Sequence, residues 1–288
     1  MTRIAALTHV RKDDYFLALW IKYYSEICGR AHLHVMLDGD DWTSAVDLSG
    51  LQVEVLTGRE GLRVRDDSRL AAAHTRKLSE LFQSYDYVIR GDCDEFVCID
   101  PAAGLSWPEA LSETRAEGYV YCNGVDVIHD PTTEAAFDSR KPILAQRRNG
   151  VLHKGYFKPN VMSRAVASSA GGHRADGPVV VSAHFYMFHL ANFDEGVFAQ
   201  RMQARVSDAK GGSYDSHAVT RRSVSAVIDT CDSPLDFDEG IARARIQLST
   251  RGGKTVVYRP QKFRDGTVEF EGNKAFLVRI DPRFRDIL

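Results

Sequence analysis

Residues 87–100 read YVIRGDCDEFVCID and place three acidic side chains between two apolar segments. The first segment, residues 87–90, has the composition of a buried strand. The acids Asp92, Asp94 and Glu95 follow within a few positions, and apolar sequence then returns at once. Acids at a strand end are common in solvated turns, but both flanks are apolar here, and unpaired charges in such a place are costly. The pattern therefore predicts that the cluster binds a cation.

Asp92 and Asp94 have the spacing needed to share one ligand. Residues i and i+2 of an extended backbone point to the same side, so both carboxylates can face one point. Two hard oxygen ligands suit Mg²⁺ or Mn²⁺, which keep other positions open for water and phosphates. We therefore predict that Asp92 and Asp94 bind Mn²⁺ or Mg²⁺, and that this ion holds a nucleotide diphosphate and neutralises it as it leaves. Glu95 is out of register with the two aspartates and is expected to orient neighbouring groups.

The sequence around this cluster alternates strands with helices. Strands are predicted at residues 3–10, 32–37, 51–56 and 85–90, and amphipathic helices at residues 15–28 and 68–85. This alternation predicts an α/β fold with a Rossmann-like, mostly parallel central sheet flanked by helices. Ligands of such sheets gather at the carboxyl ends of the strands, so Arg11, Asp38 and the acidic cluster should lie together.

Beyond residue 100 the pattern becomes mixed. Strand-like segments occupy residues 118–123, 155–163 and 178–190, and an amphipathic helix covers residues 194–206 with Asp194 as its N-cap. Near the end, Gly272-Asn273 lies between two apolar runs, which is typical of a β-hairpin.

Composition excludes several classes of protein. The chain has 37 Lys and Arg against 39 Asp and Glu, so a nucleic-acid partner is not expected. Its five cysteines are odd in number and form no C-x-x-C pair, which argues against a disulfide framework and favours a cytoplasmic location. Because no apolar run approaches the length of a membrane span, roughly 18 residues, we expect no transmembrane segment, although peripheral membrane contact stays open.

Two motifs carry a resemblance to a known family. VRKDDYFLALWIKYY, residues 10–24, resembles the V-R-N-E opening motif of family 2-like, GT-A-type glycosyltransferases, with Lys12 where that family usually has asparagine. GDCDEF, residues 91–96, is similar to the family's D-x-D-E-F metal motif. The resemblance implies a GT-A-like fold and transfer of a sugar from a nucleotide diphosphate sugar, with a UDP-sugar favoured, to a carbohydrate or glycolipid hydroxyl. It also implies that residues 1–250 form the catalytic domain.

Within that domain we expect a nucleotide-sugar half at residues 1–100 and an acceptor half at 101–250, with residues 251–288 as a C-terminal β-hairpin appendage. The resemblance also assigns roles to individual residues. Those expected to bind the donor are Arg11, Asp13, Asp38, Arg76, Lys77, Asp92 and Lys158. For Arg76 and Lys77, an ordinary solvated helix face is an equal alternative. His173 is expected to be a third metal ligand or a diphosphate donor, with His189 as its substitute.

The catalytic base cannot be identified from a motif. An inverting transferase needs a carboxylate that takes the proton of the acceptor hydroxyl. Asp126 is the preferred candidate, and Asp130 and the pair Asp194-Glu195 are alternatives. Two other functions remain open. A sugar nucleotidyltransferase usually has a glycine-rich loop after its first strand, which THVRKDDYF lacks, and a non-catalytic nucleotide- or sugar-binding module would not need both aspartates.

Overall fold

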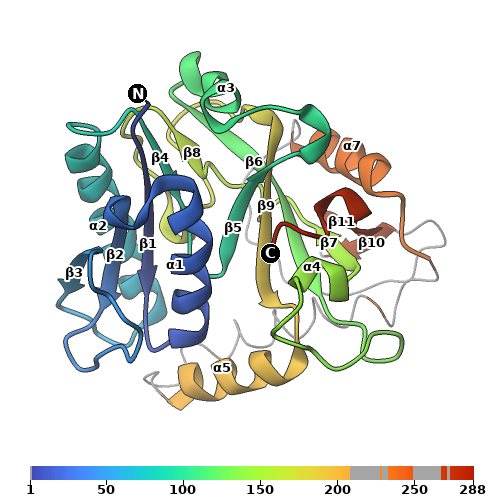
Figure 1. Ribbon diagram of the computed structural model, residues 1–288, viewed down its shortest axis with the longest axis horizontal. Coiled ribbons are helices and arrows are strands. Elements are labelled where there is room, and N and C mark those ends of the chain that lie inside the picture. Colours follow the sequence, from blue (N-terminus) through green and yellow to red (C-terminus); the bar gives the residue numbers. More distant parts are fainter. Residues whose placement is uncertain (1, 208–227, 229–232, 249–266, 271–272) are drawn as a thin grey trace.

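The computed structural model describes residues 2–207, 228, 233–248, 267–270 and 273–288. A curled central sheet carries helices packed on its faces (Figure 1). Parallel strands form the part built by residues 4–90, and the rest of the sheet is mixed. The predicted α/β fold class, with a Rossmann-like sheet and a mixed second half, is confirmed.

Residues 4–90 build the parallel part of the sheet. Its elements are β1 (Ile4–Val10), α1 (Asp14–Cys28), β2 (Leu33–Asp38), β3 (Gln52–Leu56), α2 (Arg63–Leu81) and β4 (Tyr87–Arg90). The strands lie in the order β3-β2-β1-β4, and each neighbouring pair is parallel. The carboxyl ends of β1, β2 and β4 therefore meet at one edge, as expected from the sequence.

The remaining elements extend the sheet with mostly antiparallel pairs. They are β5 (Glu95–Ile99), α3 (Trp107–Leu111), β6 (Tyr119–Ile128), α4 (Ile143–Gln146), β7 (Asn149–Leu152), β8 (Val161–Met162), β9 (Val181–Asn192), α5 (Glu195–Ser207), α7 (Phe237–Leu248), β10 (Thr267–Phe270) and β11 (Asn273–Arg279). Short 3-10 turns cover Arg30–His32, Pro101–Ala103, Ser112–Arg115, Ala170–Gly172 and Pro282–Phe284. β8 pairs with both β4 and β6 and so joins the two parts, while β9 pairs with β6 and with β5.

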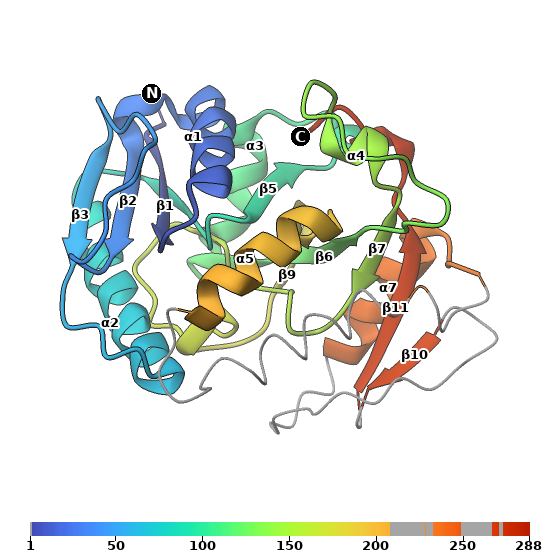
Figure 2. The ribbon, with the colours of Figure 1, turned by 90° about the horizontal axis from the view of Figure 1, so that it is seen from below.

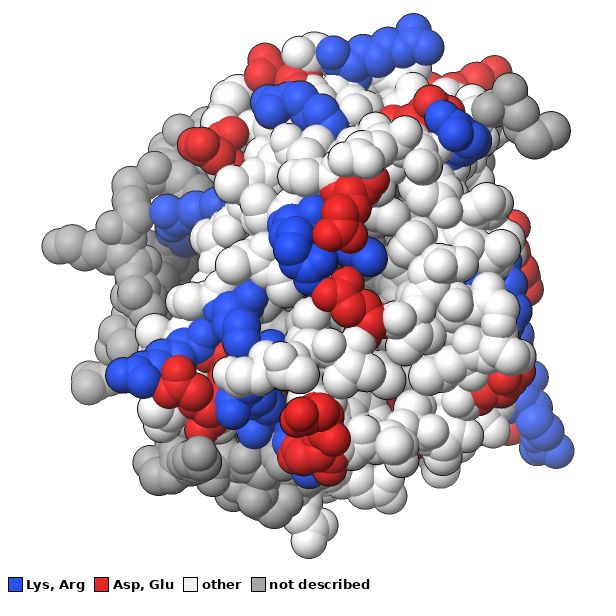
Figure 3. Space-filling view, turned by 90° about the vertical axis from the view of Figure 1, so that its left-hand side faces the viewer, with Lys and Arg blue, Asp and Glu red and all other residues white. Residues whose placement is uncertain are grey.

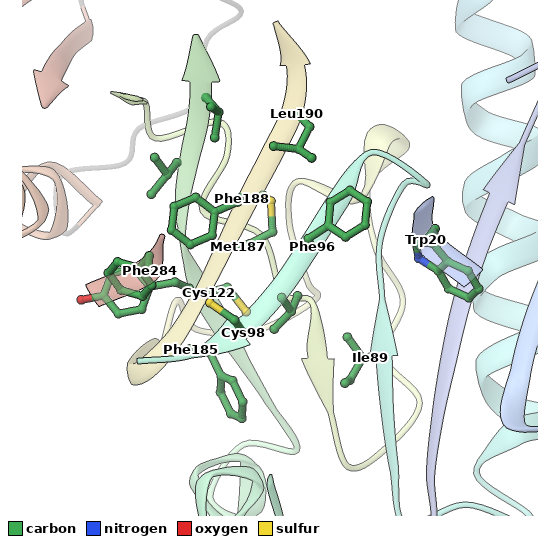
Figure 4. Close-up of a cluster of buried hydrophobic side chains, with 14 of the residues drawn as sticks. Trp20, Ile89, Phe96, Cys98, Cys122, Phe185, Met187, Phe188, Leu190 and Phe284 are labelled. Carbon is green, nitrogen blue, oxygen red and sulfur yellow. The ribbon is translucent and has the colours of Figure 1, made fainter. Parts of the chain in front are cut away.

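A single apolar cluster fixes α1 against β5 and β9. Figure 4 shows Trp20 of α1 on one side of this cluster, Phe96 of β5 in its middle and Phe188 of β9 on the other side. The Tyr24 hydroxyl accepts from the amide of Val97 at 2.9 Å and donates to the carbonyl of Glu95 at 3.1 Å. Because these contacts hold both the side chains and the backbone of β5, they fix the segment that directly follows the two aspartates.

The second half departs from the sequence expectations at several places. The strand expected at residues 155–163 shortens to Val161–Met162, because the preceding residues form a turn closed by a hydrogen bond from Tyr156 N to His153 O. In the hairpin, Phe270 of β10 pairs with Asn273 of β11, and the predicted turn residue Gly272 lies outside the described residues. β11 also pairs with β7, so the hairpin continues the sheet.

Helix α5 lies across the edge of the sheet toward which the arrows of β1 and β2 point (Figures 1 and 2). Asp194 caps it as predicted, since its Oδ1 accepts from the amides of Gly196 and Val197 at 2.9 and 3.1 Å. This placement brings a helix of the second half over the carboxyl ends of the first. None of the helices in the described part of the chain is long and apolar enough to cross a membrane.

Candidate active site

Arg11 directly follows β1 and fixes the loop at the end of β2. Its Nη1 donates to the Asp38 carbonyl at 2.8 Å, and Nη1 and Nη2 each lie 2.8 Å from a carboxylate oxygen of Asp41. These hydrogen bonds hold the pKa of Asp41 well below its ordinary value. The next residue, Lys12, has a φ of 48°, a left-handed conformation that asparagine adopts more readily than lysine. The asparagine that the V-R-N-E motif has at this position would thus suit the backbone better than Lys12 does.

Asp38, at the end of β2, is buried and paired with arginines. Arg69 of α2 donates to its Oδ1, and the Arg59 Nε atom lies 3.9 Å from its Oδ2. Neither arginine is among the residues expected from the sequence, because nothing local in the sequence connects them to β2. The acid expected near the nucleotide base is therefore held by two basic side chains.

Asp92 is the partly exposed acid of the cluster, with about a third of its side chain, 35%, accessible. Lys158 Nζ lies 3.5 Å from its Oδ2, and His9 Nδ1 lies 3.7 Å from its Oδ1. Burial would raise the pKa of Asp92, but the charges of Lys158 and His9 outweigh it and hold the pKa well below its ordinary value. Asp92 is thus an ionised carboxylate that reaches solvent, with Lys158 beside it.

Glu95 holds the loop that carries the two aspartates. Its Oε1 accepts from the buried Lys158 ammonium, and its Oε2 accepts from the Asp92 amide and from Asn160 Nδ2, each at 3.2 Å. Burial raises the pKa of Glu95, against the opposing effect of Lys158. Because Glu95 is 1% exposed and engaged by the loop and by Lys158, it orients neighbouring groups, in agreement with its expected role.

Asp94 and Asp13 share one arginine from α5. Arg201 donates from Nη2 to Asp94 Oδ2 and from Nε to Asp13 Oδ2, both at 2.7 Å, and its guanidinium lies 4.3 Å from the centre of the Phe16 ring. The acid of the opening motif and the second acid of the metal motif are thereby joined. Sequence reasoning missed Arg201, although an arginine beside Met202 on the buried face of an amphipathic helix signals a buried counter-ion.

His189 lies between Asp94 and Asp126. Its Nε2 is 3.6 Å from Asp94 Oδ2, and its Nδ1 is 2.8 Å from Asp126 Oδ1. Asp126 is fully buried, and its other oxygen accepts from Asn192 Nδ2 at 3.3 Å. The expectation that Asp126 takes a proton directly from an acceptor does not suit this geometry, because both of its oxygens are engaged inside the sheet. Its position is that of a residue that orients His189.

His173 lies apart from the pair that it was expected to complete. Its Nδ1 is 2.7 Å from the carbonyl of Gly155. Among the residues that the structure describes, no three His, Cys, Asp or Glu side chains are grouped so that they could hold a metal ion, and this excludes Asp92, Asp94 and His173 as such a set. His189, the substitute predicted for His173, is the histidine that lies near Asp94.

Arg76 and Lys77 lie on the outer side of the molecule. Both form ion pairs with Glu54 of the edge strand β3 and with Glu80 of α2. Figure 3 shows a mostly uncharged face on this side, over which small groups of both charges are scattered and no large patch of a single sign is seen. These ion pairs tie α2 to β3, which matches the solvated helix face that was the alternative for Arg76 and Lys77.

The other candidate bases have structural partners. Asp130 accepts from the hydroxyls of Thr132 and Thr133, both at 2.6 Å, and thus closes a turn. Asp194 caps α5 and pairs with the buried Arg147 at 3.0 Å. Glu195 is exposed on the first turn of that helix.

The donor atoms at Asp94 and His189 suit a divalent cation. A carboxylate that accepts from one nitrogen of an imidazole, as Asp126 does from His189 Nδ1, is the usual support for a metal-binding histidine. Mg²⁺ and Mn²⁺ commonly take one or two carboxylates from the protein and complete their shell with water and phosphate oxygens. Asp94 and His189 therefore fit such an ion as a pair, while the partly exposed Asp92 is not grouped with both of them as a third ligand in the described part of the chain.

Comparisons with known proteins give no family. No protein-family model matches the chain, and no curated protein matches it. Among solved structures, the crystal structure of mannose-1-phosphate geranyltransferase from Thermus thermophilus aligns at 11% sequence identity with a TM-score of 0.30. The alignment covers 78% of this chain and 65% of that one, less than two thirds of its length. A likeness this distant carries no argument about activity.

Proposed function

We propose that this protein is a metal-dependent glycosyltransferase. It moves a sugar from a nucleotide diphosphate sugar, with a UDP-sugar favoured, to a hydroxyl of a carbohydrate or glycolipid. The observation that carries this proposal is the joining of the two motifs through Arg201, which bonds Asp13 of the first motif and Asp94 of the second at 2.7 Å each. Two sequence segments that resemble one family thus meet at one carboxyl edge, where α/β sheets bind ligands.

The residues at this edge have complementary tasks in the proposed reaction. Asp94 and His189 hold Mn²⁺ or Mg²⁺, with Asp92 beside them, and Asp126 fixes the orientation of His189. When bound, the divalent ion stabilises negative charge on the diphosphate as the glycosidic bond to it breaks. The opposing charge of Asp92 and Glu95 raises the pKa of Lys158 despite its burial, so that Lys158 supplies a second positive charge beside the carboxylates. Arg11 fixes the loop at Asp38, where we place the nucleotide.

A thermal-shift titration tests this function. Uridine diphosphate should stabilise the protein only when Mn²⁺ is present, by about 2.7 kcal/mol at a hundredfold excess over its dissociation constant. Asp94→Asn, which removes the carboxylate assigned to the ion, should abolish this stabilisation. The control Asp138→Asn, an acid that pairs with the exposed Arg140, should keep it. Stabilisation without metal, or none with any nucleoside diphosphate, would contradict the proposal.

Assays on the nucleotide that binds separate the neighbouring activities. Slow metal-dependent hydrolysis of the matching nucleotide sugar supports a transferase, because water then replaces the acceptor. Binding without hydrolysis indicates a binding module. Release of diphosphate from a nucleoside triphosphate and a sugar phosphate would instead identify a nucleotidyltransferase.

A further inference from the structure

Arg201 is an internal counter-ion at Asp94, the more buried of the two aspartates of the metal motif. Its side chain is 7% exposed and that of Asp94 is 4% exposed. The guanidinium bonds Asp94 through Nη2 and Asp13 through Nε, while its buried Nη1 makes no hydrogen bond to the described part of the chain. A buried guanidinium nitrogen without an acceptor is costly. The arrangement therefore gives Asp94 a counter-ion but leaves one nitrogen of Arg201 without a hydrogen-bond acceptor in the described part of the chain.

The same carboxylate oxygen serves two partners. Asp94 Oδ2 accepts a hydrogen bond from Arg201 and also lies 3.6 Å from His189 Nε2. Asp94 Oδ2 and His189 Nε2 are the two atoms that suit a divalent cation. Two cations at one carboxylate repel each other strongly where water is largely excluded. A metal ion bound through Asp94 therefore competes with Arg201 for this acid.

The contacts of Arg201 allow it to leave Asp94 without leaving the site. Its Nε bond to Asp13 and its stacking on Phe16 involve neither Asp94 nor His189. With Nε anchored, Nη1 and Nη2 remain as a planar pair of donors, the geometry that suits phosphate oxygens. A diphosphate would supply the acceptor that Nη1 lacks.

We propose that Arg201 is exchanged between Asp94 and the donor diphosphate, so that it blocks metal binding in the free protein and binds phosphate once metal and nucleotide arrive together. This inference rests on the proposed function. Its consequence is reciprocal coupling: nucleotide strengthens metal binding, and metal strengthens nucleotide binding by the same factor.

Mn²⁺ titrations followed by electron paramagnetic resonance test the exchange, since they report free Mn²⁺ without any assay of activity. In Arg201→Gln, Mn²⁺ alone should bind at least about tenfold more tightly than in the wild type, and added uridine diphosphate should strengthen Mn²⁺ binding much less than it does in the wild type. Arg283→Gln is the matched control, because Arg283 also pairs with Asp238 and Asp100 and lies 4.8 Å from the centre of the Phe284 ring. It should behave as the wild type does.

The outcomes separate this inference from the function on which it rests. Equal Mn²⁺ affinity in the wild type and in Arg201→Gln would overturn the exchange and leave the metal site standing. No Mn²⁺ binding in either protein, with or without uridine diphosphate, would overturn the metal requirement and the exchange together. If Arg201→Gln does not fold, Arg201→Lys replaces it. Lysine has one nitrogen and cannot hold Asp13 and a diphosphate in the same way, so the coupling between metal and nucleotide should again decrease.

Discussion

His189 and Asp126 face each other on neighbouring strands, with imidazole Nδ1 2.8 Å from carboxylate Oδ1. The parallel register of β6 and β9 places the two residues opposite each other. A carboxylate can only accept, so Nδ1 carries a proton, and in the neutral ring Nε2 then presents its lone pair on the side of Asp94. The buried acid thus determines which nitrogen of His189 is available to a ligand.

Asp126→Asn should weaken Mn²⁺ binding by about 10- to 100-fold, because the amide can donate to Nδ1 and so permits the other tautomer of His189. Isothermal titration calorimetry measures the change. Asp130→Asn alters a buried acid of the same region that closes a turn, and it should leave Mn²⁺ affinity unchanged. If both variants bind Mn²⁺ as the wild type does, Asp126 is purely structural.

Lys158→Met should lower the free energy of unfolding by about 3–5 kcal/mol, because it leaves the buried Glu95 without its cation. Urea denaturation measures the loss. The double variant with Glu95→Gln should recover a large part of it, since both charges are then absent. A double variant whose loss equals the sum of the two single losses would show that Lys158 and Glu95 do not interact.

The free energy of unfolding should decrease as the pH is lowered from about 6.5 to about 4, because of His34. Burial, and to a smaller extent the charge of Lys77, lower the pKa of this β2 residue from 6.5 to about 4. The folded protein keeps His34 neutral while the unfolded chain takes up a proton below pH 6.5, so the stabilisation is complete above that pH. The loss by pH 4 is on the order of 3 kcal/mol.

The contribution of His34 can be isolated by substitution. Urea denaturation of the wild type and of His34→Gln across pH 4–8 should give a shallower pH dependence for the variant. Parallel curves for the wild type and His34→Gln would assign the acid sensitivity to other groups.

Lys12→Asn should raise the free energy of unfolding by about 1 kcal/mol, because asparagine adopts the left-handed conformation at this position with less strain. Lys22→Asn, on the exposed side of α1, should instead lower it by a few tenths of a kcal/mol through its poorer helix propensity. Thermal or urea unfolding distinguishes these opposite signs. A loss of stability in both variants would mean that Lys12 makes compensating contacts.

Local patterns were sufficient to predict the order of the elements in the first half of the fold, although the helix expected at residues 68–85 lies at Arg63–Leu81. The apolar face of α1 packs as the spacing of Phe16, Trp20 and Tyr24 indicated, and Gly29 ends that helix with a φ of 82°. Asp38 and Asp92 follow parallel strands, so sequence order alone predicts that they lie at one edge. These features depend on residues close to one another in the chain, and the spacing of apolar residues in the sequence indicates them directly.

The rest of the site depends on contacts between distant parts of the chain. His189 reaches Asp94 because β9 pairs with β5, with Glu95 opposite His189, and no local pattern fixes that register. His173 directs its ring toward the carbonyl of Gly155, a contact that the sequence does not indicate. Arg201 joins residues 107 and 188 positions away. Burial also changes the role of Asp126, and burial in the middle of a sheet depends on both neighbouring strands.

The chain passes from one part of the sheet to the other between Arg90 and Glu95. β4, before this segment, pairs with β1 and β8, and β5, after it, pairs with β9. A change of β9 during evolution would therefore alter the surface of the protein and, at the same time, disturb Asp94 and His189. Descendants of this protein that acquire new substrates should accordingly keep β9, and also β7, which pairs with β6 at Asp126, and diverge at β10 and β11.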